Sequence, residues 1–198
     1  MKKIAISIGD LNGIGLEIAL RAHEEISKTC KPVYCVNETM LLQGAKKLGL
    51  EIPKDFDTIY CMRDFTITEG IPTKQSGRAS FKSFKKALKL TKKGYTKALV
   101  TLPINKEAWN KAGIKYKGHT DALADILGED AIMMLGCEKL FVALFTHHIP
   151  LKDVTKSLHV KSLKKFLLDF YNASKVDKIG VLGLNPHAGD NGVIGDEE

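Results

Sequence analysis

Apolar runs of strand length alternate with segments of helical periodicity along most of the 198-residue chain. The longest apolar runs have few polar interruptions, which is typical of strands buried on both faces of a parallel sheet. They span residues 3–8, 32–36, 97–102 and 178–184. Segments with the spacing of amphipathic helices lie between them. The main ones span residues 16–26, 38–48, 76–93 and 160–171. The pattern predicts an α/β protein with helices on both faces of its sheet.

Turn and capping residues mark where several of these elements begin and end. Gly49 is expected to stop the second helix, and Gly94 to stop the third. Asn105 is suited to cap a helix that ends at Gly113. Thr120 or His119 is expected to cap the following helix. Further short strands are expected at residues 58–61, 131–135 and 140–145.

The last four residues, Gly195 to Glu198, have the pattern of a helix start, with Asp196 as the cap, but the sequence stops before the body of the helix. Since no helix follows, residues 1–198 are expected to be the N-terminal part of a longer two-lobe protein; a frayed natural tail is the alternative. A chain with this ending is expected to be inactive by itself.

Charge and composition exclude several classes of protein. The formal net charge is +7, but Lys supplies most of it, whereas recognition of bases and phosphates favours Arg. The Lys-rich stretch 82–93 fits the solvated face of a helix whose apolar side is Phe81, Phe84, Leu88 and Thr91. We therefore expect no nucleic acid as partner, and attraction of anionic metabolites instead.

Neither membrane insertion nor export is expected. No apolar stretch approaches the roughly 20 residues that span a membrane. The apolar N-terminal run is interrupted at Asp10 and Asn12, which is unlike a signal peptide. Four cysteines without metal-type spacing predict reduced thiols, so the expected location is the cytoplasm.

Three loops bounded by Gly or Pro carry histidines, at His119, His148 and His187. Imidazoles gathered at one edge of a sheet serve as metal ligands, proton carriers or phosphate donors. Three unrelated surface histidines are the alternative. His147 and His148 are adjacent, so an extended backbone would send them to opposite sides and only one would face a cleft with His187. Two imidazoles leave a zinc site incomplete, and Asp153 is either a further ligand or a helix cap.

Two other loops follow predicted strands, where α/β proteins bind ligands. The loop from Gly9 to Gly15 offers helix-start amides to an anion, but it lacks the dinucleotide-binding glycine pattern, and a tight structural turn fits equally well. Lys106 follows the third strand. It is either a ligand for phosphate or carboxylate, or a solvated lysine.

Seven motifs together resemble the 4-hydroxythreonine-4-phosphate dehydrogenase family of pyridoxal 5'-phosphate biosynthesis. They are Gly9-Asp10-x-x-Gly13-Ile14-Gly15, Ser76-Gly77, Thr101-x-Pro103-x-x-Lys106, Ala112-Gly113-Ile114, Gly118-His119-Thr120, His148-x-Pro150-Leu151 and Gly183-x-Asn185-Pro186-His187-Ala188-Gly189. The last three are specific in their order and spacing, and the first is weaker alone.

The resemblance implies an α/β/α two-lobe fold similar to isocitrate and isopropylmalate dehydrogenases, incomplete in this chain, with the active site completed across a homodimer. It implies NAD-dependent oxidation of 4-phosphohydroxy-L-threonine, followed by decarboxylation to 3-amino-2-oxopropyl phosphate. His119 and Thr120 would bind the substrate. His148 and His187 would be metal ligands, with a third histidine in a further segment. Zinc is the expected ion, with magnesium or cobalt as alternatives.

Two other functions stay open at this point. One is a non-catalytic remnant that binds phosphorylated metabolites. The other is a related dehydrogenase that acts on a phosphorylated threonate, because such relatives share the three histidine loops.

Overall fold

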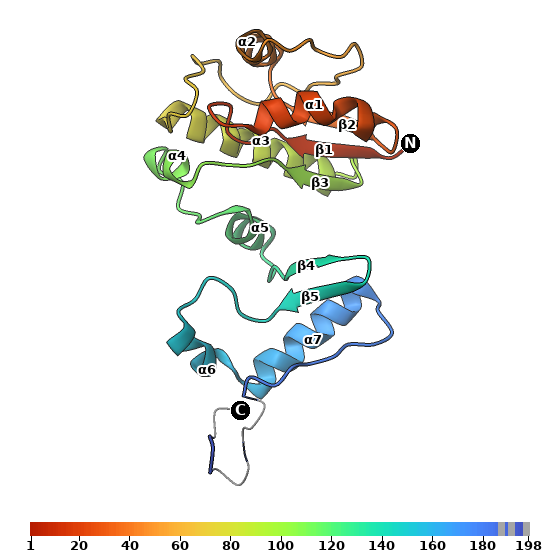
Figure 1. Cartoon of the computed structure of the whole chain (residues 1–198), viewed down its shortest axis with the longest axis vertical. Coiled ribbons are helices and arrows are strands. Elements are labelled where there is room, and N and C mark those ends of the chain that lie inside the picture. Colours follow the sequence, from red (N-terminus) through yellow and green to blue (C-terminus); the bar gives the residue numbers. More distant parts are fainter. Residues whose placement is uncertain (186–188, 190–192, 196–198) are drawn as a thin grey trace. The chain divides into compact units, whose positions relative to one another are not determined.

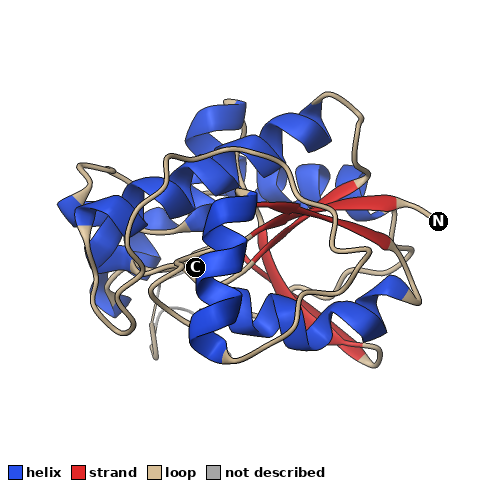
Figure 2. Ribbon diagram, turned by 90° about the horizontal axis from the view of Figure 1, so that it is seen from above, coloured by secondary structure: helices blue, strands red, loops and turns tan. Residues whose placement is uncertain are grey.

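The computed structural model describes residues 1–185, 189 and 193–195, and the chain divides into two compact units, Met1–Ala122 and Leu123–Glu198. The first unit holds a parallel sheet in the order β2-β1-β3. Its strands are β1 (Lys3–Ser7), β2 (Lys31–Cys35) and β3 (Ala98–Thr101). All three were predicted, with boundaries displaced by one residue at most at either end. Figure 2 shows these strands in red among the blue helices.

Helices cover both faces of this sheet, as predicted (Figure 1). The helices are α1 (Gly15–Ser27), α2 (Glu38–Leu48), α3 (Lys74–Lys92) and α4 (Lys106–Lys111), and α5 (His119–Leu127) follows. With α1 and α2, the larger core includes Ile6, Ile8 and Tyr34. On the other face of β1 and β2, Ala5 and Cys35 pack with Ala87 of α3. Alternation of side chains along each strand therefore divides the core into two layers.

The ends of α2 and α4 follow the expected capping rules. Gly49 ends α2 in the left-handed conformation with φ 63°, which glycine adopts without a Cβ clash. The Asn105 side chain accepts a hydrogen bond from the Ala108 amide, 2.9 Å, and so caps α4.

The beginnings of α3 and α5 were predicted incorrectly. Helix α3 begins at Lys74 because Thr73 and Ser76 form a reciprocal capping box, so Ser76 lies inside the first turn. Helix α5 already contains His119 and Thr120. The Gly118 carbonyl accepts from the Ala122 amide, 3.2 Å, so neither residue is the cap.

The buried face of α3 is made mainly of small residues. Of the predicted apolar side, Phe84 and Leu88 are buried, whereas Phe81 and Thr91 are half-buried. The buried positions are Ser76, Gly77, Ala79, Ser80, Ser83, Phe84, Ala87 and Leu88. A small-residue face lets the helix approach its neighbours closely. At Gly77 the approach is so tight that a Cβ would overlap the Ala108 carbonyl of α4.

A buried histidine joins α1 to the connection after β2. The rings of Tyr34 and Phe56 stack with centroids 3.8 Å apart. The nitrogens of His23 lie 3.0 Å from the Tyr34 hydroxyl and 3.1 Å from an Asp55 carboxylate oxygen. The hydrogen bond from His23 lowers the pKa of the Asp55 carboxyl. Near Asp55, the strand expected at residues 58–61 is reduced to a single bridge between Tyr34 and Thr58.

The second unit contains an antiparallel hairpin of β4 (Met133–Cys137) and β5 (Leu140–Leu144), followed by helices. These are the 3-10 turn η1 (Leu151–Asp153), α6 (Val154–Ser157) and α7 (Val160–Ser174). Phe166 of α7 contacts Phe145 edge to face with centroids 5.4 Å apart. Among the described residues after Ala122, none is fully buried.

The strand predicted at residues 178–184 is absent. This segment is irregular and exposed, and Leu182 is 91% exposed. A strand needs a hydrogen-bonded neighbour, and both described sheets are formed without this segment. The helix start predicted at Gly195 with the Asp196 cap involves residues 196–198, which lie outside the described residues. No helix within the described ranges is long and apolar enough to cross a membrane.

We predict that Gly77→Ala destabilises the first unit. Alanine raises helix propensity by about 1 kcal/mol. Overlap with a backbone carbonyl costs about 3 kcal/mol, because relief requires α3 and α4 to separate. A loss of about 2 kcal/mol in the free energy of unfolding should appear in urea titrations. Gly180→Ala is the control, since a Cβ there meets no atom within 4 Å. Equal stability of both variants would show that α3 and α4 separate at little energetic cost and would contradict the prediction.

Candidate functional site

The loops after β1 and β3 meet at the carboxyl edge of the parallel sheet. The Asp10 amide donates to the Pro103 carbonyl, 2.9 Å. Gly9 has a φ of 72°, and a Cβ on it would overlap the same carbonyl. Glycine is needed here both for the left-handed conformation and for the close approach. The first and third motifs of the sequence analysis are thus in direct contact at the edge where open α/β sheets bind ligands.

The loop from Gly9 to Gly15 is a self-bonded turn. The Asn12 amide donates to an Asp10 carboxylate oxygen, 3.1 Å, and the Gly13 amide donates to the Asp10 carbonyl, 3.0 Å. Desolvation by burial raises the pKa of the Asp10 carboxyl, although hydrogen bonds from the Asn12 amide and Ser76 oppose the shift. Two of the amides that an anion would use are therefore bonded within the loop. This geometry favours the structural-turn interpretation.

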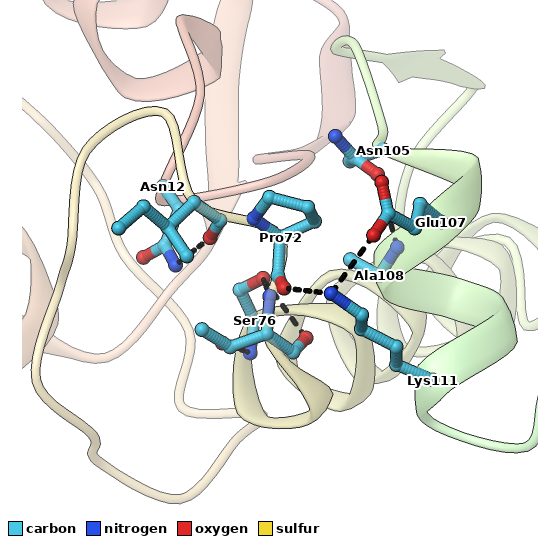
Figure 3. A network of polar contacts seen from close by, with 9 residues as sticks. Asn12, Pro72, Ser76, Asn105, Glu107, Ala108 and Lys111 are labelled. Carbon is cyan, nitrogen blue, oxygen red and sulfur yellow. Dashed lines mark hydrogen bonds and ion pairs between the residues drawn. The ribbon is translucent and has the colours of Figure 1, made fainter.

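Asn12 also holds the connection that leads into α3. Its side-chain oxygen accepts from the Thr68 amide, 3.1 Å, and its side-chain nitrogen donates to the Ile71 carbonyl, 2.7 Å. Its backbone carbonyl accepts from the Gly70 amide, 2.7 Å. One buried amide side chain therefore links the first loop to the residues before α3, as seen on the left of Figure 3.

Lys111 ties α4 to the same connection (Figure 3). Its ammonium donates to the Pro72 carbonyl, 3.1 Å, and pairs with Glu107 of its own helix, 2.8 Å. Lys106, the lysine expected near a ligand, begins α4 and is exposed. The structure leaves both interpretations of Lys106 open.

His119 lies at the first position of α5 with its ring against an aromatic cluster. Its centroid is 5.2 Å from that of Phe84 and 5.7 Å from that of Trp109. Desolvation lowers the pKa of the imidazole below its ordinary value, which favours the neutral ring. Its Nε2 is shielded from solvent and has no hydrogen-bond partner in the structure. A buried polar atom without a partner is costly, so a hydrogen bond from a bound ligand would be stabilising here.

Thr120 follows His119 in the first turn of α5 and is half-buried. The first turn of a helix has unpaired amide donors and the positive end of the helix dipole. The two predicted substrate-binding residues thus share a helix start in the first unit.

His148 belongs to the second unit, and its backbone differs from the expectation. The φ of His148 is 56°, so the His147–His148 pair is not extended. The two rings contact each other edge to face, with centroids 5.5 Å apart. His148 is exposed, whereas His147 is half-buried, and its Nδ1 has no hydrogen-bond partner in the structure. A left-handed non-glycine residue is uncommon and often marks a functional position.

The predicted metal site is only partly described. His187 lies outside the described residues, so its distance from His148 is untested. Within the part of the chain that the structure describes, no three His, Cys, Asp or Glu side chains group closely enough to hold a metal. Asp153 pairs at 3.5 Å with Lys156, and its side chain makes no capping hydrogen bond to α6.

Sequence reasoning missed the residues that surround His119. Trp109 and Phe84 were assigned only to helices, and Ser80 was not singled out. A signal was present: Ser76, Ser80 and Ser83 recur at spacings of four and three on the face of α3 where apolar residues are expected. All three are buried. Such a row of serines indicates a helix face that makes buried hydrogen bonds.

Parallel strands, helices on both faces and motif loops at the carboxyl edge define this chain as an α/β protein of the ligand-binding open-sheet class. Residues 28–198 match the family model described as pyridoxal phosphate biosynthetic protein PdxA. The chain belongs to the PdxA family.

Relatives named 4-hydroxythreonine-4-phosphate dehydrogenase are similar in sequence along nearly the whole chain. It is 55% identical over 196 residues to 4-hydroxythreonine-4-phosphate dehydrogenase of Sulfurimonas denitrificans, covering 99% of this chain and 64% of that enzyme. Identity to the enzyme of Campylobacter fetus is 52%, covering all of this chain and 64% of that enzyme. The chain thus spans slightly less than two thirds of their length.

Solved structures agree with the fold class. The enzyme from Burkholderia phymatum superposes with a TM-score of 0.78 at 29% identity, covering 98% of this chain and 66% of that chain. The enzyme from Klebsiella pneumoniae gives 0.77 at 30% identity, covering 99% and 66%. The expected α/β fold, similar to isocitrate and isopropylmalate dehydrogenases, is confirmed.

We predict that Asp10→Asn changes how stability depends on pH. Burial raises the pKa of Asp10, so the folded protein keeps this proton to higher pH than the unfolded chain. Stability therefore falls as the pH rises from about 4, the ordinary value, to the raised value, and stays lower above it. Asparagine keeps the oxygen that accepts from the Asn12 amide and removes this decline. Urea unfolding across the acidic range measures it, with exposed Glu51→Gln as control. A profile unchanged from the wild type would contradict the role of burial.

Proposed function

We propose that this chain acts in the NAD-dependent oxidation of 4-phosphohydroxy-L-threonine, which is followed by decarboxylation to 3-amino-2-oxopropyl phosphate. The observation that carries the proposal is the 55% identity to a 4-hydroxythreonine-4-phosphate dehydrogenase over 99% of the chain. The unpartnered Nε2 of His119, in a motif that the family shares, supports it. Because the chain spans 64% of that enzyme, the activity belongs to a polypeptide that includes the remaining segment.

His119 and Thr120 are the proposed substrate-binding residues. A neutral imidazole either donates or accepts a hydrogen bond at Nε2, and both suit an oxygen of a phosphorylated hydroxy acid. The hydroxyl of Thr120 and the amides at the start of α5 supply further donors. For a substrate oxygen to become the partner that the shielded Nε2 of His119 lacks, the groups that cover this atom must move aside.

His148 and His187 are the proposed metal ligands, with a third ligand from outside this chain. The exposed imidazole of His148 fits a ligand position, and zinc is the expected ion. Magnesium and cobalt are alternatives. A bound cation supplies charge that acidifies the substrate hydroxyl. Since the described residues hold no complete ligand set, no step of the reaction is assigned through the metal.

NAD is the proposed hydride acceptor. Two amides of the loop from Gly9 to Gly15 are bonded within the loop, and the loop lacks the dinucleotide-binding glycine pattern, so no residue of this chain is assigned to the NAD pyrophosphate. In the overall reaction the carbinol carbon loses a hydride to nicotinamide and the hydroxyl loses a proton. The resulting β-keto acid then releases its carboxylate as carbon dioxide, and the carbon left with the electron pair takes up a proton to give the ketone. A homodimer with the active site at the subunit interface and a cytoplasmic location complete the proposal.

We predict that His119→Ala weakens substrate binding without lowering the melting temperature greatly. Loss of one hydrogen bond to a charged ligand costs about 1.5–3 kcal/mol, or roughly 10- to 100-fold in affinity. Calorimetric titration with 4-phosphohydroxy-L-threonine measures the loss, and exposed His159→Ala is the control. Unchanged affinity in His119→Ala would refute the assignment. NADH formation by the longer polypeptide tests the reaction, and a parallel assay with a phosphorylated threonate tests the alternative substrate.

We predict that His148→Ala lowers zinc affinity in the longer polypeptide by at least about 100-fold, since loss of an outer-shell partner alone costs 10- to 100-fold. Zinc competition with a chromogenic chelator measures the affinity, and His147→Ala is the matched control from the neighbouring position. If His147→Ala causes the larger loss, the ligand assignment is reversed.

A further inference from the structure

The chain contains a single tryptophan, and hydrogen bonds hold its ring in place. Trp109 is completely buried, and its indole Nε1–H donates to the Ser80 hydroxyl oxygen at 2.7 Å. The Ser80 hydroxyl in turn donates to the Gly77 carbonyl at 3.0 Å. Because Ser80 has one hydroxyl proton and gives it to Gly77, its oxygen is left to accept from the indole. The donor and the acceptor of both hydrogen bonds are therefore determined.

The fixed indole meets the ring of His119. Their planes are 83° apart with centroids 5.7 Å apart, which is an edge-to-face contact. Phe84, also completely buried, contacts the same imidazole with centroids 5.2 Å apart. Two buried aromatic rings therefore restrict the rotation of the imidazole, while its Nε2 remains without a hydrogen-bond partner.

We propose that Ser80 and Trp109 are positioning residues that set the orientation of the His119 ring for hydrogen bonding to the phosphorylated substrate. The inference rests on the proposed substrate-binding role of His119. Hydrogen bonds connect Gly77 to Ser80 and Ser80 to Trp109. Trp109 then contacts His119 through its aromatic ring. None of these three supporting residues needs to touch the substrate.

Orientation by hydrogen bonding differs from simple core filling. If Trp109 only filled space, another aromatic ring would serve, and the Ser80 hydroxyl would not affect ligand binding. Burial lowers the pKa of the imidazole and so favours its neutral form, which adds to the need for positioning. A neutral ring makes a directional hydrogen bond, whereas a charged ring also attracts an anion at less favourable angles.

The test uses Ser80→Ala and Trp109→Phe, which remove the indole–hydroxyl hydrogen bond from either side. The control is Phe81→Leu. Phe81 contacts the ring of Trp109 at 5.3 Å and that of Phe84 at 6.2 Å, so its loss loosens the same aromatic cluster without removing the Ser80 bond. Affinity for 4-phosphohydroxy-L-threonine is measured for each variant alone and combined with His119→Ala.

We expect Ser80→Ala and Trp109→Phe each to weaken binding about tenfold, with no further loss when His119 is already alanine, since both act through that ring. Phe81→Leu should lower the melting temperature but change affinity less than twofold. Losses that add to that of His119→Ala, or wild-type affinity in both variants, would overturn the proposal.

A second measurement needs no substrate. The ring resonances of His119, observed by NMR, should shift in Ser80→Ala and Trp109→Phe and stay near their wild-type positions in Phe81→Leu. Unshifted resonances in the first two variants would overturn the positioning role even if they bind weakly. If the resonances shift but His119→Ala binds normally, the proposed substrate role has failed, whereas the ring orientation by Ser80 and Trp109 stands.

Discussion

The close contact between α3 and α4 is the constraint on which the candidate site depends. Gly77 has no side chain where the Ala108 carbonyl approaches, and the next residue, Trp109, comes within hydrogen-bond distance of Ser80. A larger residue at Gly77 would move α4 and its indole away from α3. The ring of His119 contacts that indole edge to face. The steric fit between α3 and α4 therefore affects the orientation of the His119 imidazole.

The same region shows how polar groups are divided between structure and function. Asp10 and Asn12 are buried and bonded to nearby backbone groups, which fastens the loops at the carboxyl edge of the sheet. His119 differs, because its shielded Nε2 has no partner. Buried polar groups in folded proteins are usually paired, and the Nε2 of His119 is one of three unpaired buried side-chain atoms among the described residues, with Ser7 Oγ and His147 Nδ1. Of the three, it is the one that lies in a motif predicted to bind substrate.

Much of the fold was predictable because its signals are local. Continuous apolar runs predicted β1, β2 and β3, and Gly49 and Asn105 marked helix ends through their backbone and capping chemistry. The segment 178–184 has the same apolar character but forms no strand, because its neighbours in space and not its composition decide pairing. The candidate site was predicted in part: motifs indicated His119 and Thr120, the row of serines on α3 that includes Ser80 was overlooked, and nothing indicated the role of Trp109.

By itself, the sequence determined the α/β class, the helix and strand order of the first unit, and the family, since these depend on periodicity and on motifs read along the chain. Tertiary structure decided which of the candidate residues are structural. In sequence, the first glycine loop could be an anion site or a structural turn; in the structure, two of its amides are bonded to Asp10, which favours the turn. The environment of His119 comes from two separate helices, α3 and α4, that precede it in the chain. Burial and hydrogen-bond partners arise only when such segments pack together, so no local pattern specifies them.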